Sequence, residues 1–347
     1  MNRTSGTVNI KTVVGVLVGL AVVVAVVAVV RLDVFGDKGS GLSKEFTYDV
    51  AELARVDPNL ILYEESAGAI ETGFSDAHGI AVDSEGSIYV AGDRAIRIFA
   101  QNGDLQREIE LADAPRCLAV SADGTLYIGL KDHVEIYDAQ GQRQASWDSL
   151  GPDAILTSIA VTKNDVFVAD AGNRVVVRYD TTGNLVNTIG RKDADRNIPG
   201  FVVPSAYFDL AMSGDGLLRV VSPGRLRVEA YTLDGDFEFS WGRPSVDIDG
   251  FCGCCNPVNI AVLPDGGFVT CEKGLVRVKV YDSEGRFEGV VASPNQLVEG
   301  GEHEICEFPE QCQAGGFDVT VDSAGHVFVL DTIKNTVRTF TRVKGQS

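Results

Sequence analysis

The sequence lacks every short motif that usually marks a catalytic or nucleotide-binding site. It contains no GxSxG nucleophile elbow, no HExxH zinc motif, no P-loop and no glycine-rich dinucleotide turn. Methionine and tryptophan are rare, with 2 of each, but 45% of the residues are apolar and the composition is that of a globular chain. These absences favour a binding protein over an enzyme.

Positive charge is also scarce. The chain has 30 Lys and Arg against 49 Asp and Glu, which gives a formal net charge of −19. A protein that binds duplex nucleic acid needs a basic face to displace counterions from phosphates, so nucleic acid is excluded as the expected partner. The same charge argues against docking on an anionic lipid surface, although it would attract a metal or another cation.

One long hydrophobic run stands at the N-terminus. Residues 12–32 carry no charge between Lys11 and Arg31, and about 20 such residues suffice to cross a bilayer as a helix. The alternative is a cleaved signal peptide, whose apolar region is normally shorter, roughly 7–15 residues. We therefore expect residues 1–11 to be a flank, 12–32 a single transmembrane helix and 33–58 a flexible linker. The domain that follows is expected outside the cytoplasm.

The rest of the chain contains six copies of one pattern. Each copy has a short apolar strand, a turn with Gly or Asp, a strand rich in Val and aromatic residues, and a third strand that ends in an aromatic residue before another turn. The Asp-Gly and Asn-Gly turns mark tight hairpins, because Gly adopts positive φ at little cost. The copies begin at Gly79, Cys117, Ser158, Asp209, Asn259 and Asp318.

These repeats predict an all-β fold, a six-bladed β-propeller over residues 59–347 preceded by the transmembrane helix. A four-stranded sheet cannot bury both of its faces alone, and six sheets stacked around an axis solve this problem. The sixth repeat ends near Ser347 without a fourth strand. We expect a strand near residues 60–64 to supply it, which would close the ring and remove exposed sheet edges.

Two of the copies resemble NHL repeats. VFVADAGNRVVVRYDTTGNLV (Val166–Val186) and VFVLDTIKNTVRTF (Val327–Phe340) are similar to that family, and the other four copies keep the strand pattern without its Asp–Asn–Arg signature. The resemblance covers roughly residues 60–345. It implies a propeller, a fold that serves scaffolds, binding proteins and some enzymes.

The connections between blades lengthen along the chain, at Arg191–Ser205, Arg243–Pro257 and Ser293–Gly316. The propeller topology places them on one rim, where long loops on a rigid scaffold commonly carry function. Cys117, at the start of a strand, is expected to be a small buried residue. The other six cysteines and one histidine are expected at the rim with these loops: Cys252, Cys254, Cys255, Cys271, Cys306, Cys312 and His303.

Three interpretations of these cysteines remain open. An exported domain with long loops favours disulfides, whose pairing the sequence does not determine. The spacing Cys252-x-x-Cys255 also suits a divalent metal or an iron–sulfur cluster, completed by Cys271, Cys306, Cys312 or His303. Redox-active thiols are the third interpretation, and they would require a lowered pKa.

A second candidate site lies at the mouth of the central channel. The first strand of each blade lines this channel, so the residues that begin these strands converge there. Asp209, Asn259 and Asp318 from adjacent blades offer oxygen ligands of the kind that Ca²⁺ prefers, and His78 lies at the same rim. Wet, polar residues without a ligand are the alternative. His133 and His326 are expected to be ordinary strand residues.

The sequence thus predicts a membrane-anchored interaction module that presents its long-loop rim to a protein, peptide or glycan. Two alternatives use the candidate sites. Gluconolactonase-type propellers resemble this architecture and hold a central divalent cation, which implies a metal-dependent lactonase or hydrolase using Asp209, Asn259 and Asp318. The other alternative is a metal or iron–sulfur redox accessory protein that uses the cysteines.

Overall fold

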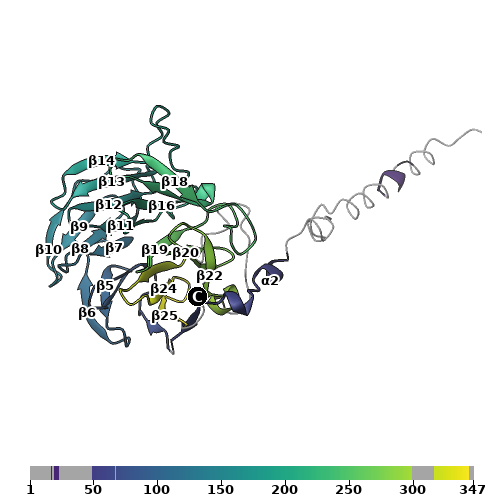
Figure 1. The fold of residues 1–347 in the computed structure, drawn as a ribbon, viewed down its shortest axis with the longest axis horizontal. Helices are drawn as coiled ribbons and strands as arrows, with labels where there is room; N and C mark the ends of the chain where they lie inside the picture. The colour runs from purple at the N-terminus through teal and green to yellow at the C-terminus, as the bar shows by residue number, and fades with distance from the viewer. Residues whose placement is uncertain (1–16, 18, 23–48, 67, 299–315, 344–347) are drawn as a thin grey trace, which may run out of the picture. The chain divides into compact units, whose positions relative to one another are not determined.

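The computed structural model describes residues 17, 19–22, 49–66, 68–298 and 316–343. The chain divides into two compact units, Met1–Asp49 and Val50–Ser347. In the second unit the described strands form six antiparallel sheets arranged around a common centre (Figure 1). The expected all-β, six-bladed propeller is confirmed.

Each blade is a meander of consecutive strands. Blade 1 has β3 (Ala77–Val82), β4 (Ile88–Gly92), β5 (Ala95–Phe99) and β6 (Leu105–Glu110); blade 2 has β7 (Cys117–Val120), β8 (Leu126–Gly129), β9 (Val134–Tyr137) and β10 (Arg143–Ser146); blade 3 has β11 (Leu156–Val161), β12 (Asp165–Asp170), β13 (Val175–Asp180) and β14 (Leu185–Ile189). Blade 4 has β15 (Leu210–Met212), β16 (Leu218–Ser222), the one-turn helix η3 (Pro223–Arg225), β17 (Arg227–Tyr231) and β18 (Phe237–Trp241); blade 5 has β19 (Asn259–Val262), β20 (Phe268–Glu272), β21 (Arg277–Tyr281) and β22 (Phe287–Ala292), followed by α3 (Pro294–Leu297).

Blade 6 is completed by the beginning of the domain. It has β23 (Asp318–Val321), β24 (Val327–Asp331) and the long β25 (Thr336–Arg342), whose outer edge pairs with β1 (Tyr63–Glu65) and β2 (Ile70–Glu71). The closing strand β1 therefore overlaps only the end of the expected range 60–64, and it continues beyond that range. The first strand of each blade contacts that of the next, and β23 contacts β3, so the ring closes.

The core lies between the blades, because alternate residues of a strand point to opposite faces of its sheet. In β12, Val166 and Val168 pack in the cluster shared with blade 2, while Phe167 and Ala169 pack in the cluster shared with blade 4. All four are fully buried. The outermost strand β10 is exposed along its length.

The short hairpin turns follow the expected chemistry. Asp180 Oδ1 accepts hydrogen bonds from the backbone N–H of Thr182 (2.9 Å) and Asn184 (3.0 Å), while Gly183 supplies the positive φ of 91°. Asp282 makes the same pair of contacts in blade 5. This local pairing explains why the repeats are recognisable from the sequence.

The expected transmembrane helix, 12–32, lies largely outside the described residues. Leu17 and residues 19–22 are helical, and within the described part of the chain no helix is long and apolar enough to cross a membrane. Part of the expected linker belongs instead to the propeller unit. It forms α2 (Val50–Leu53) and the short helix η2 (Pro58–Leu60), and Ala54 is buried against Cys252 and Leu275.

Candidate functional site: the channel mouth

The six innermost strands enclose a central cavity of about 390 Å³. At its middle, five of the six lining positions are alanine, and small side chains there leave the axis open. Toward the end of the strands the lining becomes larger and apolar. The middle residues are Ala81, Ala119, Ala160, Ala211, Ala261 and Thr320, and the following residues are Val82, Val120, Val161, Met212, Val262 and Val321.

The polar residues at the opposite end of the channel join neighbouring blades. Asp209 Oδ2 accepts a hydrogen bond from the backbone N–H of Ile260 (2.6 Å), which links blade 4 to blade 5. Asn259 donates to the carbonyl of Phe317 (2.7 Å), linking blade 5 to blade 6. Asp318 Oδ2 accepts from the N–H of Ile80 (2.9 Å), linking blade 6 to blade 1. The three residues expected at the mouth are therefore close together, and each stabilises the ring.

Asp209 and Asp318 interact electrostatically within the channel. Burial raises the pKa of Asp209 to about 6. Burial and the charge of Asp209 together raise the pKa of Asp318 to about 7. The second oxygen of each carboxylate accepts the N–H of the next residue, Leu210 or Val319, at 2.8 Å. The two carboxyl groups together therefore carry less than two negative charges near neutral pH.

A second cavity of about 220 Å³ lies at this end of the channel. The residues that line it include Asp318, Asn259, Arg116, His78 and Tyr207. His78 lies 3.4 Å from Asp76, while no ion pair within the described chain involves the exposed Arg116. The mouth thus offers the Arg116 guanidinium and several hydrogen-bonding side chains to one small ligand group.

β-bulges aim several of these side chains at the mouth. The register of β3 shifts between Ala77 and Gly79, at His78, and that of β11 shifts between Leu156 and Ser158, at Thr157. A bulge turns a side chain away from the regular alternation. Thr157 lines both cavities and donates to the carbonyl of Phe208 (2.5 Å).

Sequence reasoning identified His78 and missed Arg116, Thr157 and Tyr207. Arg116 and Thr157 directly precede Cys117 and Ser158, as His78 precedes Gly79. Inspecting the residue directly before the start of each repeat would therefore have identified Arg116 and Thr157. Tyr207 lies on a connection between blades, where no repeat pattern applies.

The described cysteines have different surroundings. Cys271 is fully buried in the core cluster of blades 5 and 6, and Cys252 packs with Ala54 and Leu275. Cys254 and Cys255 are adjacent, with their sulfur atoms 3.3 Å apart. No set of three or more His, Cys, Asp or Glu side chains in the described ranges is arranged to hold a metal. The predicted contributions of His303, Cys306 and Cys312 lie outside those ranges.

Four of the described thiols, those of Cys117, Cys252, Cys254 and Cys271, have a raised pKa rather than the lowered pKa of a reactive cysteine. Burial raises the pKa of Cys252 to about 12 and that of Cys254 to about 11. Burial raises the pKa of Cys117 and Cys271 as well. Thiolates, rather than thiols, are the nucleophiles and the metal ligands. Cys117 is buried at the start of β7, as expected.

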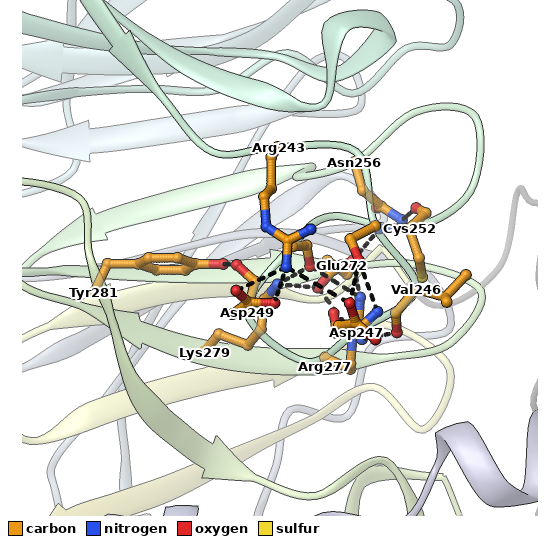
Figure 2. Close-up of polar contacts among 12 residues, drawn as sticks. Arg243, Val246, Asp247, Asp249, Cys252, Asn256, Glu272, Arg277, Lys279 and Tyr281 are labelled. Atoms are coloured by element: carbon orange, nitrogen blue, oxygen red, sulfur yellow. Dashed lines mark hydrogen bonds and ion pairs between the residues drawn. The ribbon is translucent and has the colours of Figure 1, made fainter.

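The cysteine-bearing loop is held by a buried ion cluster in blade 5 (Figure 2). Glu272 binds Arg277 Nη2 at 2.8 Å and Lys279 Nζ at 2.7 Å, and it accepts the N–H of Cys252 at 3.0 Å. Both cations also donate to the carbonyl of Gly250. All three charged side chains are almost completely buried, at 0–1% exposure. The cluster therefore fixes residues 243–257 onto the strands of blade 5.

The electrostatics of this cluster favour an ionised Glu272. Burial opposes ionisation, but the charges of Arg277 and Lys279 hold the pKa of Glu272 below its ordinary value. Burial lowers the pKa of Lys279 to about 8 despite that carboxylate. Lys273, which follows Glu272 in the chain, donates to the Ser205 hydroxyl (3.1 Å) and lies 4.4 Å above the ring of Tyr207. Blade 5 thereby positions one wall of the mouth.

Comparison with known proteins gives the fold. No protein-family model and no curated protein matches the chain. Among solved structures, a streptogramin B lyase is 13% identical, with a TM-score of 0.55, and the match covers 83% of this chain and 100% of that chain. Virginiamycin B lyase from Staphylococcus aureus, crystallised as an inactive variant with quinupristin, is 12% identical over 81% of this chain and 100% of that chain, with a TM-score of 0.53.

The WD40 β-propeller domain of Doa1 is also similar, at 16% identity and a TM-score of 0.52, over 78% of this chain and 80% of that chain. At this level of identity the likenesses show that the chain is a β-propeller. The group contains both a lyase and a WD40 domain, so the fold does not determine the function.

Proposed function

We propose that the protein is a binding module whose ligand enters the channel mouth on the long-loop rim. The observation that carries this proposal is the 220 Å³ cavity where Arg116, His78, Asn259 and Asp318 converge. A cavity of this size lies below the roughly 300–1,000 Å³ of sites for drug-sized molecules. It suits one chain terminus, side chain or sugar of a larger protein, peptide or glycan partner.

The side chains of the mouth favour a ligand that presents an anion together with hydrogen-bond donors. Arg116 and His78 suit a carboxylate or another anion, because a guanidinium donates two parallel hydrogen bonds to such a group. Asn259 and Asp318, which line the same cavity, suit a hydroxyl or amide donor. A peptide terminus or an acidic sugar offers both kinds of group.

The metal-dependent hydrolase has weaker support. Both oxygens of Asp209 and of Asp318 already accept backbone N–H groups, and the raised pKa of each carboxyl disfavours the charged form that a hard cation needs. The redox alternative is weakened by the raised pKa values of Cys252 and Cys254.

Replacing Arg116 by alanine tests the proposed binding site. The full-length protein is screened on arrays of short peptides with free termini and of oligosaccharides, and the hits are titrated in solution. We expect Arg116→Ala to weaken binding about tenfold, because it removes a charge-assisted hydrogen bond. Arg94→Ala is the matched control, since Arg94 is exposed on a neighbouring loop. Hits that bind Arg116→Ala and His78→Ala as tightly as the wild type would place the site elsewhere.

We also propose that the blades are of the NHL type. In blade 3, Asp170 accepts the N–H of Asn173 (3.1 Å) and the Asn173 side-chain amide (2.6 Å). In blade 6, Asp331 accepts the N–H groups of Ile333 (3.0 Å) and Lys334 (2.9 Å). The acidic residue of the signature thus caps the turn after the second strand in both copies that carry it.

A membrane anchor at residues 12–32 remains part of this proposal, with the propeller on the extracytoplasmic side. It rests on the uncharged run in the sequence. We expect full-length protein to stay with membranes after an alkaline carbonate wash, and a variant lacking 12–32 to become soluble. A variant with Lys38→Ala and Lys44→Ala should behave like the wild type. Release of the full-length chain by carbonate would contradict the anchor.

A further inference from the structure

Blade 3 carries a further cavity of about 290 Å³ on the rim, separate from the cavity at the channel mouth. Its walls come from two segments: the turn between β12 and β13, and the start of the long connection into blade 4. Three basic residues line it, Arg174 from the turn and Arg191 with Lys192 from the connection. All three are exposed.

These three cations have no ion-pair partner among the described residues. Most arginines in the described part of the chain are paired, as Arg178 is with Asp165 (2.8 Å) and Arg196 with Asp236 (2.6 Å). Arg174, Arg191 and Lys192 make no ion pair or side-chain hydrogen bond with any described residue, although the chain carries 49 acidic residues. A concentration of free positive charge at one cavity is therefore not a consequence of composition.

The backbone beneath these residues is fixed. Asp193 and Ile198 exchange backbone hydrogen bonds of 3.1 and 2.7 Å, and Arg225 donates to the carbonyl of Pro199 (3.0 Å). Gly190 has a φ of 81°, and a Cβ there would lie 1.8 Å from the ring of Phe201. Only glycine allows this close approach, which holds the base of the loop against the buried aromatic ring.

The turn that bears Arg174 is equally constrained. Asp170 Oδ1 accepts the N–H groups of Ile155 (3.0 Å) and Asn173 (3.1 Å), and Arg174 itself has a φ of 57°. A positive φ is uncommon outside glycine and asparagine. The corresponding position in blade 6 is Asn335, with a φ of 56°. An arginine at this strained position presents a guanidinium where the local conformation favours asparagine.

We propose that this cavity binds a tetrahedral oxyanion, such as the phosphate or sulfate group of a larger ligand. Two guanidinium groups and one ammonium group provide donors that match such oxygens, and their positive charges attract the negative charge of the group. A rigid base lowers the entropy lost on binding. The surrounding charge of −19 favours a compact anionic group over a polyanion such as duplex nucleic acid.

Titration of the full-length protein with inorganic phosphate tests the site. We expect saturable binding by isothermal titration calorimetry at low ionic strength, weakened about tenfold in Arg174→Asn. Asparagine keeps the positive φ, so this variant should retain the wild-type melting temperature. Arg191→Gln, in the loop, is a second variant with the same expected loss.

Lys163→Ala is the matched control, because Lys163 lies in the turn between β11 and β12, on the opposite rim. We expect it to bind phosphate as the wild type does. Inorganic sulfate and acetate separate the chemistries: sulfate should bind similarly and acetate more weakly. Equal affinity of the wild type, Arg174→Asn and Arg191→Gln, or no saturable heat with phosphate or sulfate, would overturn the proposal. Neither result bears on Arg116, so this test is independent of the one at the mouth.

Discussion

Replacing Glu272 by alanine is expected to lower the free energy of unfolding by about 3–5 kcal/mol. The carboxylate is fully buried and is the only acidic side chain that the structure pairs with Arg277 and Lys279. Its removal leaves two cations in the core whose remaining partners among the described residues are backbone carbonyls and, for Lys279, the rings of Phe251 and Tyr281. The N–H of Cys252 also loses its acceptor, so residues 243–257 should loosen.

Chemical denaturation of the full-length protein measures this effect, and hydrogen exchange reports on the loop. Glu284→Ala is the control, since Glu284 forms an exposed pair with Arg286 at 2.9 Å. Exposed pairs contribute little, so this change should remain below about 1 kcal/mol. If Glu272→Ala lowers the free energy of unfolding as little as Glu284→Ala does, and the hydrogen exchange of the Cys252 amide is unchanged, the cluster does not hold the loop.

Replacing Asp318 by asparagine is expected to stabilise the protein at pH 8 relative to its effect at pH 4. Burial and the charge of Asp209 raise the pKa of Asp318 to about 7. The folded state therefore binds this proton more tightly than the unfolded state does. Its stabilising effect is complete at low pH and is lost as the pH rises from about 4 to about 7.

Asparagine removes the ionisation and can still accept the N–H of Ile80, while the loss of the bond from the Val319 N–H costs the same at every pH. The equivalent position in blade 5 is already Asn259. Relative to the wild type, the variant should gain on the order of 2–4 kcal/mol between pH 4 and pH 8. Denaturation curves across this range measure the gain. Asp113→Asn, at an exposed site, should show no such trend. A difference between Asp318→Asn and the wild type that is independent of pH would contradict the coupled carboxylates.

The propeller was predictable because its blades are local. Each hairpin turn is specified by a short segment such as Asp180–Gly183, and each strand by alternating apolar residues. The closing strand was predictable for a different reason, since an unpaired edge on β25 requires a partner. Its bounds shifted to Tyr63–Glu65 because η2 occupies Pro58–Leu60.

The candidate sites were only partly predictable. Equivalent positions of a repeat converge on the axis: Asp209 lines the central cavity, Asn259 lines the cavity at the mouth, and Asp318 lines both. Their use in hydrogen bonds between blades depends on the distance between neighbouring sheets, which no single repeat encodes. Tyr207 was missed for the same reason.

The sequence by itself determined the class of the domain, its repeat number and the residues that begin each inner strand, because these follow from periodicity and turn chemistry along one segment. The tertiary structure decided which charged side chains have ion-pair partners. It buried Glu272 with two cations, packed Cys252 and Cys271 in different hydrophobic clusters, and left Arg116, Arg174, Arg191 and Lys192 without ion-pair partners among the described residues. Such outcomes depend on contacts between residues far apart in the chain, and local patterns carry no information about them.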